Sequence, residues 1–229
     1  MTEPYYSDDR VTLYHGDCRE VTGWLEADVL VTDPPYGRAW RQGAMKNSDG
    51  HGRLNNSHEG IANDGGTEVR DAALARWGHR LAAVFGDLML DNPTGTQQVL
   101  IYHKAADAGI RGATARFRRD VEGIYLMGGW PSGIGGRSSV ITTKARSAGP
   151  TSLANRYGHP HAKPLDVLTD LISEAPSGVV ADPFAGSGST LVAARNLGRK
   201  AIGVELEERY CEVIAKRLAQ DVLDFGEGA

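Results

Sequence analysis

The chain of 229 residues has only two cysteines, Cys18 and Cys211, and no long apolar run. Two cysteines cannot form a disulfide framework, and these two do not show the spacing of metal ligands. No stretch is long enough to cross a membrane, and the first residues lack the basic and apolar regions of a signal peptide. We therefore expect a cytoplasmic protein that holds no metal and contacts no membrane. Because 41% of the residues are hydrophobic, residues 1–229 can form one domain with a full-sized core.

The hydrophobic pattern predicts strands that alternate with helices. The predicted strands cover residues 11–15, 27–32, 83–90, 98–102, 179–181 and 201–204. The predicted helices cover residues 67–82 and 189–197, a segment that starts at Pro164, and a last segment with Tyr210, Ile214 and Leu218 on one face. Near-continuous apolar strands are typical of parallel sheets with both faces covered. We therefore expect an α/β, Rossmann-like fold with a mostly parallel sheet and helices on both faces.

A glycine-rich loop, D-P-F-A-G-S-G at residues 182–188, follows the strand at 179–181. Its two glycines let the backbone come close to a ligand, and the next helix offers unpaired N–H groups. Glu205 ends the next strand, where a carboxylate can accept hydrogen bonds from ribose hydroxyls. A dinucleotide site is the competing interpretation, but the third glycine of G-x-G-x-x-G is absent. Asp182 would repel a pyrophosphate and suits a cationic amino acid moiety instead.

The tetrapeptide Asp33-Pro34-Pro35-Tyr36 follows the strand at residues 27–32. Open α/β sheets place their sites at such strand ends. An exocyclic amine of a base is a poor nucleophile, because its lone pair is delocalised into the ring. The Asp33 carboxylate and the Pro34 carbonyl can accept its two N–H bonds and localise that lone pair, and the prolines fix the carbonyl direction. The Tyr36 ring can stack on a flipped base.

Residues 37–66, directly after this tetrapeptide, contain seven glycines and four asparagines and almost no aliphatic side chains. Loops of this length in compact domains are usually functional or disordered. We expect a mobile loop that closes over the flipped base.

Basic residues are concentrated in one part of the chain. Residues 101–163 carry ten basic and three acidic side chains, a net charge of +7, whereas the rest of the chain carries −11. One basic segment on an acidic chain suits a polyanion that is contacted by one region, although a solvated basic surface is an equally good interpretation of charge alone.

Four motifs in this order resemble those of the amino-directed DNA methyltransferases, in the permuted class whose catalytic motif precedes the cofactor motif. They are L-x-x-G-D-C at 13–18, D-P-P-Y at 33–36, H-P-x-x-K-P at 159–164 and D-P-F-x-G-S-G at 182–188. The resemblance extends from residue 11 to about residue 218. It implies a Rossmann-like methyltransferase sheet and S-adenosylmethionine as the cofactor.

The resemblance also implies roles for individual residues. Asp17 would accept a hydrogen bond from the cofactor's adenine, with Cys18 beside it, and Glu205 would hold the ribose. Asp182 would lie near the methionine amine. The other residues that would line the cofactor are Asp33, Lys163, Phe184, Ala185, Gly186, Ser187, Gly188, Ser189 and Thr190. His159 has no task in this chemistry, and we expect it to be structural.

In this family the segment that recognises DNA precedes the H-P-x-x-K-P element, which here indicates a small insertion at about residues 104–157. The residues that we expect to contact double-stranded DNA, mostly at phosphates, are Arg116, Arg118, Arg119, Arg137, Lys144 and Arg146. Because the segment is short, either the recognised site is short or a homodimer supplies the rest of the surface.

Several alternatives stay open at this point. Aspartate rather than serine before Pro-Pro-Tyr favours adenine N6 over cytosine N4 by family habit. RNA and protein-glutamine methyltransferases share the Pro-Pro-Tyr chemistry but usually carry asparagine first and place the glycine loop earlier in the chain. A catalytically inactive DNA-binding homologue is the third alternative. The resemblance does not say whether the chain works beside a restriction nuclease, as many restriction–modification methyltransferases do.

Overall fold

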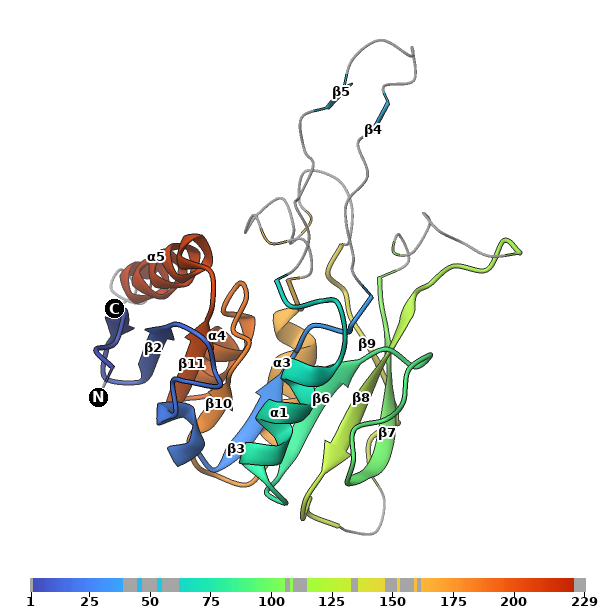
Figure 1. The fold of residues 1–229 in the computed structure, drawn as a ribbon, viewed down its shortest axis with the longest axis horizontal. Coiled ribbons are helices and arrows are strands. Elements are labelled where there is room, and N and C mark those ends of the chain that lie inside the picture. The colour runs from blue at the N-terminus through green and yellow to red at the C-terminus, as the bar shows by residue number, and fades with distance from the viewer. Residues whose placement is uncertain are drawn as a thin grey trace.

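The computed structural model describes residues 2–38, 45–46, 53–54, 62–105, 108, 115–132, 136–146, 152, 159 and 162–224. A nine-stranded sheet forms its centre, in the order β1-β2-β11-β10-β3-β6-β8-β7-β9 (Figure 1). The strands are β1 (Tyr6–Ser7), β2 (Val11–His15), β3 (Val29–Thr32), β6 (Ala82–Gly86), β7 (Thr96–His103), β8 (Val121–Met127), β9 (Val140–Thr142), β10 (Val180–Asp182) and β11 (Ala201–Glu205).

The pairing of these strands is mixed but mostly parallel. All pairs from β2 to β6 are parallel, and so is the pair of β7 and β9. β1 is antiparallel to β2, and β8 is antiparallel to both β6 and β7. We call the edge where β3, β6, β10 and β11 end the carboxyl edge.

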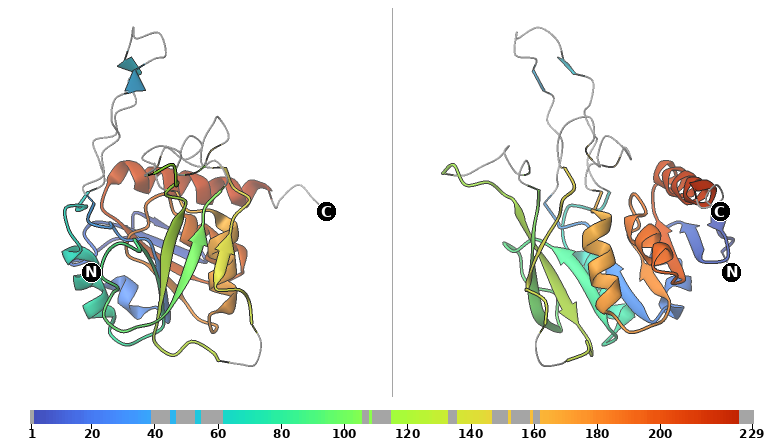
Figure 2. Two further views of the ribbon diagram at one scale, coloured as in Figure 1. Left: turned by 90° about the vertical axis from the view of Figure 1, so that its right-hand side faces the viewer. Right: turned by 180° about the vertical axis from the view of Figure 1, so that it is seen from behind.

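Helices cover both faces of the sheet. They are η1 (Gly23–Glu26, a 3-10 helix), α1 (Glu68–Trp77), α3 (Leu165–Glu174), α4 (Ser189–Asn196) and α5 (Glu208–Asp224). α1 lies in front of the sheet in Figure 1, and the view from behind in Figure 2 shows α3 and α4 on the opposite face. The expected α/β sheet with helices on both faces is therefore confirmed.

Two apolar clusters fill the spaces between these layers. One joins buried side chains of α3, α4 and α5, such as Leu168, Leu191 and Ile214, to one face of the sheet. The other joins η1 and α1 to the opposite face, where the rings of Trp24 and Trp77 stack with centroids 5.9 Å apart. Burying a large side chain on each face contributes about 1.5–3 kcal/mol per residue, so the two clusters hold the strand ends in fixed positions.

Two expected elements end earlier than the apolar pattern suggested. α1 ends at Trp77 rather than near residue 82, because Gly78 takes a φ of 76° and breaks the helix. β6 ends at Gly86 rather than at residue 90, because the Asp87 carboxylate accepts the N–H of Met89 in a turn.

The expected insertion at residues 104–157 requires a correction. It contains β8 and β9, which are strands of the main sheet. β8 is apolar at Ile124 and Tyr125, which are buried between β6 and β7.

Most of the expected mobile loop at residues 37–66 lies outside the described residues, so its closure over a base stays a prediction. Within it the structure describes a two-stranded antiparallel sheet of β4 (Met45–Lys46) and β5 (Arg53–Leu54). Among the described helices there is none that is long and apolar enough to cross a membrane.

Candidate functional site

The tetrapeptide at residues 33–36 lies where the direction of the sheet's connections reverses. β3 and β10 are parallel neighbours, with Val29 opposite Val180. From β3 the chain proceeds through α1 to β6 on one side, and from β10 it proceeds through α4 to β11 on the other. Open α/β sheets bind ligands in the crevice at such a reversal, beyond the carboxyl ends of the strands. Asp33 and the glycine loop thus meet at one point of the carboxyl edge.

A buried hydrogen bond ties the two strands together at this point. The Thr32 hydroxyl donates to Oδ1 of Asp182 at 2.7 Å, and both residues are almost completely buried. The backbone N–H of Phe184 donates to the same oxygen at 3.1 Å. Burial raises the pKa of Asp182 to about 6, although the hydrogen bonds from Thr32, Thr190 and Phe184 oppose that shift. A cationic group near this carboxylate would favour its ionised form.

The backbone of the glycine loop is left-handed at both of its glycines. Gly186 and Gly188 have φ values of 53° and 77°. A Cβ atom at Gly188 would lie 2.8 Å from Ile214, and one at Gly186 would lie 3.1 Å from the His159 ring. Gly188 is the N-cap of α4, so the loop presents the start of a helix to the crevice.

Glu205 holds the loop from the neighbouring strand. Its Oε2 accepts the N–H of Gly186 at 2.7 Å, and its Oε1 accepts the N–H of Glu207 at 2.8 Å. Burial raises the pKa of Glu205 to about 7, against the effect of these two hydrogen bonds. Each carboxylate oxygen retains a second lone pair that a ribose hydroxyl can use.

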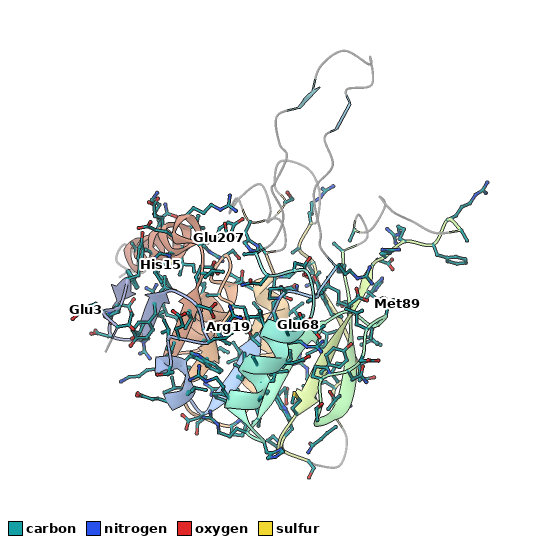
Figure 3. The ribbon with its side chains drawn as sticks, viewed as in Figure 1. Glu3, His15, Arg19, Glu68, Met89 and Glu207 are labelled. Carbon is teal, nitrogen blue, oxygen red and sulfur yellow. The ribbon has the colours of Figure 1, made fainter. Side chains whose placement is uncertain are left out.

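Asp17 follows β2, which pairs with β11 and places His15 opposite Glu205. The side chain of Arg19, which Figure 3 labels, donates to both oxygens of Asp17 and lowers the pKa of that carboxyl. Cys18 is buried, and burial raises the pKa of its thiol to about 12, so it cannot act as a thiolate near neutral pH. Its proximity to the expected adenine position stays a prediction.

The remaining residues expected around the cofactor occupy the loop and the first turn of α4. The hydroxyls of Ser187 and Ser189 lie 3.2 Å apart, and both residues are buried. Thr190 is buried beside Asp182, to which its hydroxyl is hydrogen-bonded. Ala185 belongs to the core on one face of the sheet, and Phe184 packs against the cluster on the other.

Lys163 lies beside the tetrapeptide at residues 33–36. Its Nζ is 2.5 Å from Oδ2 of Asp33 and 3.2 Å from the Tyr36 hydroxyl, which in turn donates to Oδ1 of Asp33 at 2.8 Å. Burial by itself would lower the pKa of Lys163, but Asp33 and Glu122 outweigh it and raise that pKa. The resemblance implied that Lys163 lies near the methionine carboxylate of the cofactor. In this structure its ammonium pairs with the carboxylates of Asp33 and Glu122.

Burial, Asp33 and Glu122 raise the pKa of Tyr36 well above its usual range, so its hydroxyl keeps its proton and acts as a donor. Pro34 is buried, while Pro35 and Tyr36 are partly exposed. The tetrapeptide therefore presents a carboxylate and a neutral phenol at the carboxyl edge.

Three residues of the site were missed by sequence reasoning. Glu122 of β8 is 8% exposed, and its Oε2 lies 3.2 Å from the Tyr36 hydroxyl and 3.3 Å from Nζ of Lys163. Arg217 of α5 is also buried and donates to the carbonyl of Ser187 in the glycine loop. The third is Thr32. A lone acid or base in an apolar strand or helix face is a signal that could have found the two charged ones.

The basic residues expected to bind DNA are all exposed, but they lie in two places. Arg116, Arg118 and Arg119 lie between β7 and β8, and Lys144 and Arg146 follow β9, so these five lie at the carboxyl edge. Arg137 precedes β9 and pairs with Asp170 and Glu174. These two acids lie in the second half of α3, which begins at the carboxyl edge and leads away from it, so Arg137 is apart from the other five.

These hydrogen-bond acceptors and donors fit a cofactor with a ribose, an amine and a carboxylate, as S-adenosylmethionine has. Glu205 and Asp182 are acceptors for hydroxyl and ammonium groups, and the start of α4 is a donor site for an anion. The described part of the chain contains no group of three His, Cys, Asp or Glu side chains that could hold a metal ion.

A family model described as DNA methylase, of the N6/N4 methyltransferase group, matches residues 98–217, which is more than half of the chain. The matched range begins within β7, after Asp33, and contains β8, the glycine loop and Glu205.

Over 67 residues the chain is 51% identical to YubD of Escherichia coli strain K12 and 44% identical to the type II methyltransferase M.HinfI of Haemophilus influenzae. Each match covers 28% of this chain, and they cover 29% and 19% of the two relatives, which is less than a third of the length of either.

Solved structures match nearly the whole chain. M1.HpyAVI in complex with SAM has a TM-score of 0.62 at 22% identity, covering 91% of this chain and 98% of its own. The PvuII DNA methyltransferase, which is cytosine-N4-specific, has a TM-score of 0.60 at 16% identity, covering 94% of this chain and 89% of its own. At these identities the likeness concerns the fold.

Proposed function

The chain belongs to the DNA methylase family of the N6/N4 group, and from this membership we propose that it transfers a methyl group from S-adenosylmethionine to an exocyclic amine of a flipped DNA base. The observation that carries the proposal is the position of Asp33. It follows β3, beside the end of β10 and the glycine loop, so a hydrogen-bond acceptor and a candidate cofactor loop share one crevice.

The chemistry of the target amine explains the residues of the tetrapeptide. Asp33 accepts one N–H bond of the amine and the Pro34 carbonyl accepts the other, so that the nitrogen lone pair is localised and points away from them. When bound, S-adenosylmethionine supplies an electrophilic methyl carbon whose C–S bond electrons return to sulfur. As the N–C bond forms, the nitrogen releases one proton, and Asp33 is the acceptor in contact with it. Tyr36 provides the ring on which the base stacks, worth about 1–3 kcal/mol.

The cofactor would be held by residues at three strand ends, those of β2, β10 and β11, and by the start of α4. Glu205 accepts hydrogen bonds from the ribose hydroxyls, and Asp17 accepts one from the adenine amine. Asp182 faces the methionine amine, and the N–H groups of the glycine loop and of Ser189 and Thr190 face its carboxylate. Glu205 and Asp182 are buried carboxylates with raised pKa values, which supports a role in binding donors and cations.

Double-stranded DNA would lie across the carboxyl edge. Arg116, Arg118, Arg119, Lys144 and Arg146 are exposed there and would contact phosphates. Phe117 lies among the first three and is 79% exposed, which is unusual for a large aromatic side chain and supports contact with a base or sugar.

Adenine N6 is the proposed target, on the ground that aspartate rather than serine precedes Pro-Pro-Tyr. Cytosine N4 is the second candidate, because PvuII methyltransferase, named as cytosine-N4-specific, has the same fold.

The test is methyl transfer from labelled S-adenosylmethionine to plasmid DNA, followed by nucleoside analysis. We expect N6-methyladenine from the wild-type chain and loss of at least about 99% of the label with Asp33→Ala, since an acceptor that orients the nucleophile is removed. Detection of N4-methylcytosine instead would change only the proposed target base and leave the rest of the proposal intact. Binding of S-adenosylhomocysteine without transfer to any DNA would contradict the proposal and indicate an inactive homologue or another acceptor.

A further inference from the structure

The carboxylate of Asp33 is engaged on both oxygens. Oδ1 accepts the Tyr36 hydroxyl at 2.8 Å, and Oδ2 accepts the Lys163 ammonium at 2.5 Å. Its side chain is 22% exposed, whereas that of Lys163 is 10% exposed, so the pair is largely shielded from water. A carboxylate that is neutralised at such short range is a weaker acceptor for a neutral amine.

Glu122 offers both of these donors a second acceptor. Its Oε2 lies 3.2 Å from the Tyr36 hydroxyl and 3.3 Å from the Lys163 ammonium, which is within contact distance of both. Its Oε1 is 2.5 Å from Nζ of Lys104, which stabilises the ionised form of Glu122. Two carboxylates and two ammonium groups thus form one cluster in which Lys163 and the Tyr36 hydroxyl are shared.

We infer that Glu122 is a positioning residue for methyl transfer: it takes over Lys163 and the Tyr36 hydroxyl when Asp33 turns to the target amine. This inference rests on the proposed function. The Tyr36 hydroxyl has a single proton and can donate to only one carboxylate at a time. When it donates to Glu122, Oδ1 of Asp33 becomes available for the N–H bond of the base.

Removal of the Glu122 charge would leave Lys163 with Asp33 as its one remaining anionic partner within the cluster. Lys163 would then be held more firmly on Asp33, and Asp33 would accept the amine less well. Glutamine at position 122 has nearly the same shape and retains an oxygen acceptor, so the Glu122→Gln variant tests the charge rather than the packing.

The first measurement is single-turnover methyl transfer to DNA at saturating cofactor, with Glu122→Gln beside the wild type. We expect the transfer rate to fall about tenfold at a temperature where both proteins are fully folded, while the Kd for S-adenosylhomocysteine stays close to that of the wild type. Glu122→Asp should recover part of the rate. Glu212→Gln is the matched control, because it makes the same change on an exposed face of α5 and should leave the rate unchanged. A normal rate in Glu122→Gln would overturn the inference, and so would a loss that only follows a lower Tm.

The second measurement does not depend on activity. The pKa of Lys163 is followed by NMR of labelled lysine in the full chain, and Glu122→Gln should lower it, because one of its two anionic partners is lost. An unchanged pKa would overturn the inference even in an active enzyme. If Glu122→Gln lowers the pKa of Lys163 but the wild-type chain methylates no DNA, the Lys163–Glu122 interaction is retained and the proposed function is rejected.

Discussion

The environment of Glu205 predicts that binding of the cofactor depends on pH. Its carboxylate is 8% exposed and accepts two backbone N–H groups, yet burial still raises its pKa to about 7. Near neutral pH the free protein therefore holds this group partly protonated. A ribose donates hydrogen bonds from its hydroxyls, so a bound nucleoside selects the ionised form.

The affinity for S-adenosylhomocysteine should therefore rise with pH. Because its pKa is raised, Glu205 remains protonated at pH values where an ordinary glutamate is already ionised. As the pH increases through about 7, the fraction of the protein with the ionised, binding form of Glu205 increases. Between about pH 6 and about pH 8 we expect the Kd to fall roughly tenfold, as measured by calorimetry. Glu205→Gln should bind more weakly and lose this dependence. The same pH dependence in both proteins would show that another group is responsible.

At the scale of elements, α5 fixes the glycine loop from outside the sheet. Arg217 donates to the Ser187 carbonyl at 2.5 Å and to the Ser189 hydroxyl at 3.3 Å, and the residue is 7% exposed. The loop thus has two anchors, because Glu205 holds Gly186 from the strand side. These contacts order the backbone N–H groups before any ligand binds.

Arg217→Met should destabilise the fold by roughly 1–3 kcal/mol, because the buried Ser187 carbonyl loses a charged donor. It should also weaken binding of S-adenosylhomocysteine, because the loop loses one anchor. Denaturant unfolding and calorimetry measure the two effects. Arg209→Met is the matched control on the same helix: its side chain is 53% exposed and pairs with Glu207, so it should cost less than about 1 kcal/mol. Equal losses in both variants would contradict a special role for Arg217.

The sequence allowed some elements to be predicted well and others poorly, for physical reasons. The strands at residues 11–15 and 201–204 and the glycine loop follow from local apolar runs and from backbone conformations that only glycine adopts easily. β8 was assigned to an insertion, because a short apolar strand gives no sign of which strands it will pair with.

The site shows the same division. Motif residues such as Asp33 and Lys163 could be found, but the contact between them joins positions 130 residues apart, and no local pattern encodes it. Glu122 lies outside every motif and takes part only because β8 pairs beside β6. Its role depends on tertiary placement, which the order of residues along the chain does not reveal.

At the scale of the whole molecule, the location of the basic residues matters more for DNA binding than the net charge of the chain. The chain has a net charge of −4, yet five of the six basic residues expected to bind DNA lie at the carboxyl edge with the candidate site. A local positive surface on an acidic protein attracts a polyanion to one orientation. Whether a second copy of the chain extends this surface stays a prediction that light scattering can test.

The two groups of arginines make the DNA proposal testable with one matched pair of variants. Arg119 is exposed between β7 and β8 at the carboxyl edge, whereas Arg137 is held by Asp170 and Glu174 of α3. Arg119→Gln should weaken DNA binding and reduce the slope of log Kd against log salt by about 0.9, the value for one phosphate contact. Arg137→Gln changes the net charge equally but should leave the slope unchanged. If both variants reduce the slope by the same amount, binding depends on overall charge, and the proposed surface at the carboxyl edge is wrong.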